Sequence, residues 1–214
     1  EYGAAAYAIA PHAVLFSNFS DQGIFSVPAA RSQTGRAAPP VAVTPDAAFS
    51  YADLIVDSRR HRLIAIREDH SAPGEPVNSI VGIPLEGESA GDVIASGYDF
   101  YATPRLSPDG RRLSWLAWRH PLMPWDGTEL WVADVDESGG LTNSRCIAGS
   151  NSESIYQPGW SPGGVLYFVS DRDGWWKLYR EVRVKPDATH DGPDRLTLVD
   201  RIARDTDGIA RPPA

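Results

Sequence analysis

The fold is decided by a stretch that reads Tyr101-Ala-Thr-Pro-Arg-Leu-Ser-Pro-Asp-Gly-Arg-Arg-Leu-Ser-Trp-Leu-Ala-Trp118. Extended, largely apolar segments stand on both sides of its Ser-Pro-Asp-Gly sequence. Proline presets φ at the second position of a turn, and glycine supplies the positive φ that lets the chain reverse. The stretch therefore predicts a β-hairpin, and the segment from Tyr156 to Val169 repeats this order around Ser-Pro-Gly-Gly.

The hairpin belongs to a repeat of about 50 residues. A tyrosine opens each copy, at Tyr2, Tyr51, Tyr101 and Tyr156. Later apolar strands recur at the same spacing, near Ile24, Ile80, Leu130 and Leu178 and again near Val43, Ile94, Ile147 and Leu196. Four short strands per repeat are typical of a β-propeller blade, and no segment shows the periodicity of an amphipathic helix.

We therefore predict an all-β chain, a β-propeller of about four consecutive four-stranded blades at residues 1–50, 51–100, 101–155 and 156–198. The array is predicted to be open rather than closed, because the charged sequence after Leu198 offers no strand to complete the first blade. Residues 199–214 alternate charged and small side chains without a strand pattern, so a poorly ordered tail is expected there.

Composition narrows the function classes. The net charge of −8 argues against nucleic acid as a partner, because phosphate binding needs clustered Lys and Arg. No apolar run approaches the ~20 residues that a membrane span needs, and the N-terminus shows no charged and apolar leader. Cys146 is the single cysteine and is predicted to be a small buried hydrophobic residue, which favours the reducing cytoplasm.

Two catalytic or metal-binding interpretations have little support. Gly-Glu-Ser89-Ala-Gly matches G-x-S-x-G, the nucleophile elbow, but a strand-like segment follows it where the elbow needs a helix. Ser89 is therefore predicted to lie in a loop between the third and fourth strands of the second blade. The five histidines lack metal-ligand spacing with one another or with Cys146, so neither a metal site nor a cofactor is predicted.

Aromatic side chains in or beside loops are the best binding candidates. Trp125 lies in the long loop after Arg119, and Trp175 and Trp176 form an adjacent pair after Ser-Asp-Arg-Asp-Gly. The other tryptophans alternate with polar or small neighbours and are predicted to pack between blades.

Several segments resemble one enzyme family over about residues 1–180. The most specific is His120-Pro-Leu-Met-Pro-Trp-Asp-Gly-Thr-Glu-Leu-Trp131, and Glu1-Tyr-Gly3, Tyr98-Asp-Phe-Tyr101, Ser107-Pro-Asp-Gly-Arg-Arg-Leu113 and Leu166-Tyr-Phe-Val-Ser-Asp-Arg-Asp-Gly-Trp-Trp176 agree with it. The chain is similar to the propeller domain of bacterial prolyl oligopeptidase-family serine peptidases, in particular the acylaminoacyl-peptidase-like and dipeptidyl-aminopeptidase-like subgroup.

The resemblance implies a two-domain enzyme in which a propeller of about seven blades caps an α/β-hydrolase domain with a Ser-Asp-His triad. The chain would hold only part of that cap and no catalytic residue, with the missing blades and the hydrolase domain as its partners. A cap of this kind admits short peptides and excludes folded proteins. The loop acids Asp126, Glu129 and Glu1 are then hypothetical contacts for a peptide's ammonium group or for an arginine of the hydrolase domain.

Two other readings remain open from the sequence. The first is a free-standing, closed four-bladed scaffold that binds a protein or small ligand on its axial face. The second is hydrolysis by the chain itself through Ser89. An open array would leave blade faces and strand edges uncovered, so the isolated chain is expected to be a dimer or aggregate, or to occur only as part of a larger molecule.

Overall fold

The structure is a computed structural model that describes residues 6–29, 38–45 and 47–181. In these residues the chain forms fifteen β-strands in four antiparallel sheets and no helix. Within each sheet every strand pairs with the next one in sequence, as in propeller blades. The predicted all-β architecture is confirmed. Glu1, Tyr2, the fourth blade's predicted last strand and the predicted tail lie outside the described residues.

The strands follow the chain blade by blade. The first blade contains β1 (Tyr7–Ala10), β2 (Ala13–Ser17), β3 (Ile24–Pro28) and β4 (Val41–Ala42). The second contains β5 (Phe49–Asp57), β6 (Arg62–Asp69), β7 (Val77–Pro84) and β8 (Asp92–Ala95). The third contains β9 (Phe100–Leu106), β10 (Arg112–Trp118), β11 (Glu129–Val135) and β12 (Leu141–Gly149). The fourth contains β13 (Ile155–Trp160), β14 (Leu166–Ser170) and β15 (Lys177–Arg180).

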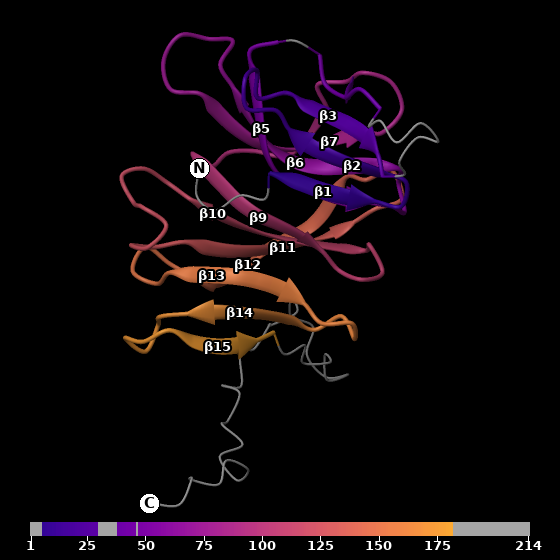
Figure 1. The fold of residues 1–214 in the computed structure, drawn as a ribbon. Helices are drawn as coiled ribbons and strands as arrows, with labels where there is room; N and C mark the ends of the chain where they lie inside the picture. Colours follow the sequence, from indigo (N-terminus) through magenta and orange to yellow (C-terminus); the bar gives the residue numbers. More distant parts are fainter. Residues whose placement is uncertain (1–5, 30–37, 46, 182–214) are drawn as a thin grey trace, which may run out of the picture.

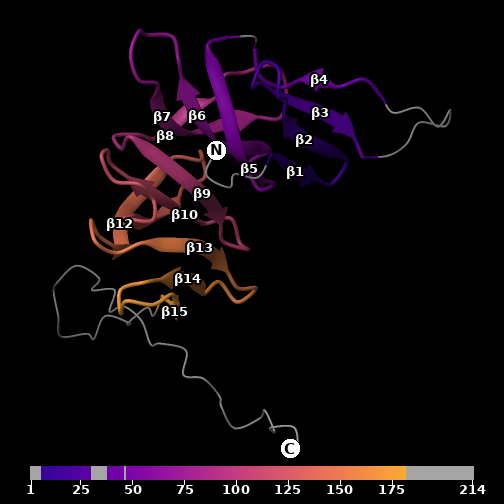
Figure 2. The same ribbon diagram turned by 60° about the vertical axis from the view of Figure 1, so that its left-hand side comes forward.

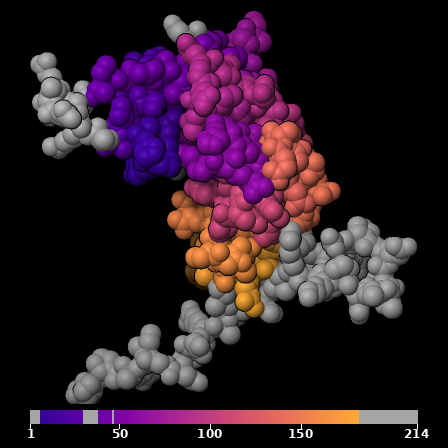
Figure 3. Space-filling view, turned by 90° about the vertical axis from the view of Figure 1, so that its right-hand side faces the viewer, coloured from indigo at the N-terminus to yellow at the C-terminus, as the bar shows by residue number. Residues whose placement is uncertain are grey.

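The blades are arranged in an open arc in sequence order (Figures 1 and 2). The first strands β1, β5, β9 and β13 contact one another in succession, which places them on the inner side of the arc. Figure 3 shows differently coloured parts of successive blades next to one another on the surface, and buried side chains of each blade pack against the next. The predicted open array is therefore confirmed, and a closed four-bladed ring is not formed by the described residues.

The core consists of three clusters, one between each pair of successive blades. Strand β6 shows how one strand serves two of them. Leu63 and Ala65 face the first blade, whereas Ile64 and Ile66 face the third, and three of the four are fully buried. A strand buried on both faces needs a continuous apolar run rather than alternation, which explains the sequence Leu-Ile-Ala-Ile of β6.

The tyrosine column is out of phase by one residue in the fourth blade. Tyr51 and Tyr101 are buried and face the preceding blade, but the equivalent position in the fourth blade is Ile155. Tyr156 is its neighbour and points to the opposite face, with 56% of its surface exposed. Side chains alternate along a strand, so a shift of one residue exchanges the faces. The predicted equivalence of Tyr156 to the other two tyrosines is wrong.

Each of the first strands β5, β9 and β13 contains a bulge at the same place. Asp53, Thr103 and Gln157 stand two residues after Tyr51, Tyr101 and Ile155 and have φ of 57°, 52° and 50°. Strand pairing shifts register near each of them. Successive bulges are linked, because the carboxylate of buried Asp53 accepts the backbone N–H of Thr103 at 2.6 Å.

Arginine side chains connect the turns of neighbouring blades. Buried Asp57 accepts from Arg60 at 3.1 Å and from Arg62 at 3.0 Å. These arginines in turn donate to main-chain carbonyl oxygens of the third blade, Arg60 to Gly110 at 2.8 Å and Arg62 to Gly139 at 2.9 Å. We call this arrangement the arginine clasp. It joins turns of the second and third blades at one end of their strands with buried, charge-assisted hydrogen bonds.

Cys146 does not have its predicted environment. It lies on the outer strand β12, where the residue is exposed, so its predicted burial is wrong. The last strand of a blade has one uncovered edge, and period-two alternation alone does not reveal which strand is outermost. Among the described residues, no helix has the length and apolar character required to cross a membrane.

Candidate functional site

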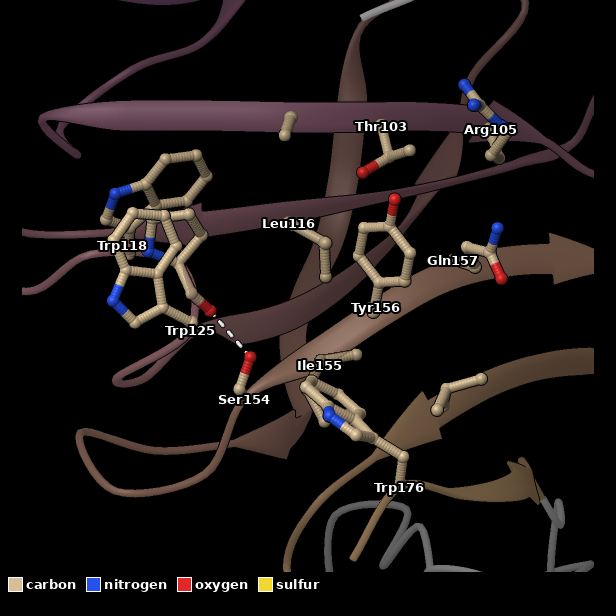
Figure 4. A pocket seen from close by; sticks show the side chains of 13 residues that line it. Thr103, Arg105, Leu116, Trp118, Trp125, Ser154, Ile155, Tyr156, Gln157 and Trp176 are labelled. Atoms are coloured by element: carbon tan, nitrogen blue, oxygen red, sulfur yellow. Dashed lines mark hydrogen bonds between the residues drawn. The ribbon is translucent and has the colours of Figure 1, made fainter. Parts of the chain in front are cut away.

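A cavity of about 650 Å³ lies on the inner side of the arc, at the junction of the third and fourth blades (Figure 4). Strands β9, β10, β13 and β14 contribute to it, together with the loop after β10 and the turn before β15. Its walls are formed by Ala102, Thr103, Arg105, Leu116, Trp118, Pro124, Trp125, Ser154, Ile155, Tyr156, Gln157, Val169 and Trp176. We call it the aromatic cavity.

The repeated bulge places polar groups in the aromatic cavity. Thr103 and Gln157 are the bulge residues of β9 and β13, and their left-handed backbone turns them out of the regular alternation. Tyr156 directly precedes the bulge residue Gln157 and points its hydroxyl group toward Thr103 in Figure 4. The one-residue phase change in the fourth blade therefore brings a tyrosine into the cavity.

The long loop between β10 and β11 carries one aromatic wall. Its Asp126 carboxylate accepts the backbone N–H of Met123 at 2.9 Å, which closes a turn around Trp125. Ser154 fixes the loop from the fourth blade by donating its hydroxyl to the carbonyl oxygen of Pro124 at 2.6 Å. Trp125 is held beside Trp118 by these contacts and stays 62% exposed.

The predicted site residues separate in the structure. Trp125 and Trp176 both line the aromatic cavity, although they are far apart in sequence. Trp175 is 78% exposed and does not line it. Asp126 caps its own loop, and Glu129 faces away into a contact with Tyr98 at 2.5 Å. The part played by any of these residues in substrate binding stays a prediction.

Trp125 and Trp176 are the only sequence candidates among the described residues that line the cavity; the others include Thr103, Arg105, Trp118, Tyr156 and Gln157. The sequence assigns Trp118 to packing between blades and interprets Tyr156 only as the residue that opens the fourth repeat. Thr103 and Gln157 could not be assigned from alternation, because each stands in a bulge and a bulge changes the face on which a side chain lies. One sequence signal could have pointed to them. Asp53, Thr103 and Gln157 occupy the same position in successive repeats, and all three are polar although the strand around them is largely apolar.

Arg105 is the only formally charged side chain among the described residues that line the cavity. Its guanidinium donates to the carbonyl oxygen of Pro104 at 2.7 Å and lies 3.6 Å from the carboxylate of Asp53. Asp53 is almost completely buried, whereas 35% of the Arg105 side chain is exposed. The buried carboxylate therefore orients the arginine from behind and leaves the guanidinium at the cavity's polar end.

Glu129 belongs to a separate polar cluster. Its carboxylate accepts from the Tyr98 hydroxyl at 2.5 Å and from the Trp131 indole at 2.9 Å. Arg119 stacks over the Tyr98 ring, with 4.1 Å between its guanidinium carbon and the ring centroid. Burial of the phenol, reinforced by its bond to Glu129, raises the pKa of Tyr98 to about 12.

This pKa shift predicts an alkaline loss of stability. The folded state disfavours the Tyr98 phenolate, so the contribution is present below the ordinary pKa of 10.0 and is lost as pH rises toward about 12. Tyr98→Phe should therefore lose less stability over this pH interval than the unaltered protein, as measured by urea unfolding at each pH. The exposed Tyr7→Phe is the control, and equal alkaline losses for Tyr98→Phe and the unaltered protein would contradict the assignment.

The G-x-S-x-G match lies where a loop was predicted. Ser89 stands between β7 and β8 of an antiparallel sheet, and its hydroxyl oxygen accepts the backbone N–H of Gly91 at 3.1 Å. Its own N–H donates to the carbonyl oxygen of Val43 at 3.1 Å. A nucleophile elbow needs a strand-to-helix turn, which the described residues do not form here. Within the described ranges, no group of three acidic, His or Cys side chains is arranged to hold a metal ion.

The described residues form a partial β-propeller, and comparison with solved structures places it beside known peptidases. A crystal structure of puromycin hydrolase is 33% identical over 84% of this chain, with a TM-score of 0.74. A mutant of puromycin hydrolase complexed with PGG is 34% identical over 82%, with a TM-score of 0.73. A Mycobacterium tuberculosis puromycin-hydrolyzing peptidase is 35% identical over 84%, with a TM-score of 0.71.

The chain belongs to the prolyl oligopeptidase family of serine peptidases, as part of its propeller. It spans only 28–29% of the length of these three proteins. A putative TolB from Agrobacterium tumefaciens, 16% identical with a TM-score of 0.54 over 92% of this chain and 60% of its own, shares the fold alone. No protein-family model and no curated protein sequence matches the chain.

Proposed function

We propose that the chain is the non-catalytic, substrate-gating part of a serine peptidase that cleaves short peptides and aminoacyl or acylaminoacyl amides. The observation that carries the proposal is the aromatic cavity on the inner strands β9 and β13. An inner-strand cavity faces the space through which a substrate would pass if a hydrolase domain lay against the propeller. The similarity to puromycin-hydrolysing peptidases supports the same substrate class.

Gating would operate by exclusion. The blades are joined by buried cores and by the arginine clasp, so neighbouring blades resist separation. A short, extended peptide can enter an opening bounded by such blades, whereas a folded domain cannot. The cavity would hold one apolar group of the peptide while another part reaches the catalytic centre.

The test uses the full-length protein that contains this chain. We expect it to hydrolyse puromycin and short peptide amides. It should not cleave the same peptide sequence when that sequence forms the terminus of a folded protein. Mass spectrometry of the released amine product measures both reactions. Absence of any hydrolysis would refute the peptidase assignment, and equal cleavage of the folded substrate would refute gating.

Ser89→Ala is the matched control for the catalytic residue. Because Ser89 bonds within its own loop, the variant should keep the full hydrolytic rate and the full labelling by a fluorophosphonate probe. Loss of both in Ser89→Ala, with the thermal melting temperature unchanged, would instead assign the nucleophile to this chain.

A further inference from the structure

We propose that the aromatic cavity binds the C-terminal residue of a peptide when that residue is aromatic, with its ring among the tryptophans and its free carboxylate on Arg105. The proposal takes its biological setting from the proposed peptidase function. Its own content is a binding preference, which is measured without hydrolysis.

The aromatic cavity has two chemically different ends. Figure 4 shows Trp118 and Trp125 together at one end, Arg105 and Gln157 at the other, and Tyr156 between them. A ligand that fills it must therefore join an apolar, preferably aromatic group to a polar one over a short distance. The volume of about 650 Å³ lies within the ordinary range of small-ligand sites.

The aromatic end is built to receive a ring. Trp118 is 3% exposed and is fixed from behind by stacking on Phe100, with ring centroids 5.4 Å apart. Trp125 and Trp176 remain 62% and 52% exposed in the cavity wall. Large exposed rings beside a fixed one offer surface that a guest ring would bury, which favours binding.

The polar end selects an anion. Arg105 is the only formal charge among the described lining residues, and Asp53 holds its guanidinium in place from the buried side. A planar guanidinium matches a carboxylate through paired hydrogen bonds. Gln157 and the hydroxyl groups of Thr103 and Tyr156 supply neutral partners nearby.

The same contacts disfavour a peptide's amino terminus in this cavity. A carboxylate is the strongest partner for an ammonium group, but Asp126 is bound to its own loop and Glu129 to Tyr98. Neither acid lines the cavity. For this cavity we therefore propose recognition of the opposite end of the peptide, and the hypothesis that the loop acids receive the ammonium group stays a prediction.

The first measurement compares three probes by isothermal titration calorimetry on the full-length protein after a fluorophosphonate has blocked its nucleophile, so that the amide probe is not hydrolysed to the acid. N-acetyl-L-phenylalanine carries both the ring and the carboxylate, its amide lacks the charge, and N-acetylglycine lacks the ring. A charged, paired contact in a partly exposed site predicts roughly tenfold tighter binding of the acid than of the amide. N-acetylglycine should bind more weakly than both. Equal affinity for acid and amide would overturn the proposal.

Matched variants locate the site. Arg105→Gln should abolish the preference for acid over amide, whereas Arg111→Gln, which removes an exposed arginine outside the cavity, should preserve it. Trp176→Ala should weaken both ring-bearing probes, and Trp175→Ala, its exposed neighbour, should weaken neither. Arg105→Lys retains the charge and should keep part of the preference.

Melting temperatures of all the variants confirm that each one is folded. An unchanged acid preference in folded Arg105→Gln would place the carboxylate elsewhere and end the proposal. The two proposals fail separately. Loss of puromycin hydrolysis alone leaves the binding result standing, and loss of the binding preference leaves peptidase activity standing.

Discussion

Asp57→Ala is expected to lower the free energy of unfolding by about 3–5 kcal/mol, the cost of leaving a buried charge unpaired. The Asp57 side chain is 1% exposed, and its partners Arg60 and Arg62 are 6% and 11% exposed. Removing the carboxylate leaves two guanidinium groups with only main-chain carbonyl oxygens as partners. Those carbonyl groups belong to the third blade, so the loss should also weaken the contact between blades.

The control is an ion pair made by the neighbouring arginine on the surface. Arg59 contacts Glu137 at 2.7 Å, also from the second blade to the third, but Glu137 is 83% exposed. Glu137→Ala should therefore change stability very little, because water screens exposed pairs. Urea unfolding of the two variants under the same conditions makes the comparison. A result in which both variants unfold at the same urea concentration would show that burial does not strengthen the clasp.

The hairpins and the repeat could be predicted because their causes are local. Ser-Pro-Asp-Gly specifies a reversal within a few residues, and Gly110 has the positive φ, 67°, that such a turn requires. The alternation or continuity of apolar residues then identifies strands and their burial. Blade order followed from these two signals and from the spacing of about 50 residues.

The aromatic cavity could not be predicted because its causes are distant. The bulge at Gln157 and the phase of Tyr156 depend on pairing with β14, which alternation within β13 does not specify. Arg105 is positioned by Asp53 from the preceding blade. Glu129 follows a long loop in the sequence and is therefore interpreted as a loop acid, but its carboxylate binds Tyr98 and Trp131 outside the cavity. Single residues on a repeat therefore acquire their roles from other strands, either in the same blade or in the preceding one.

Phe168→Ala should destabilise the fourth blade by about 3–5 kcal/mol, the usual cost of truncating a buried phenylalanine. Phe168 is fully buried in the cluster between the third and fourth blades, and its ring lies 6.0 Å from that of Tyr179. Phe19→Ala is the matched control, because Phe19 is 92% exposed and its removal leaves no cavity.

The location of this loss distinguishes a repeat array from a globular core. In an array each unit is stabilised by its own contacts and by those with its neighbours. Phe168→Ala should therefore accelerate amide hydrogen exchange in residues 155–181 while β5 to β8 keep their protection. Uniform acceleration across all described blades would show instead that the blades unfold as one unit. In the expected case the aromatic cavity is lost first, since β13 and Trp176 belong to the released blade, and binding of aromatic ligands would fall before the other blades unfold.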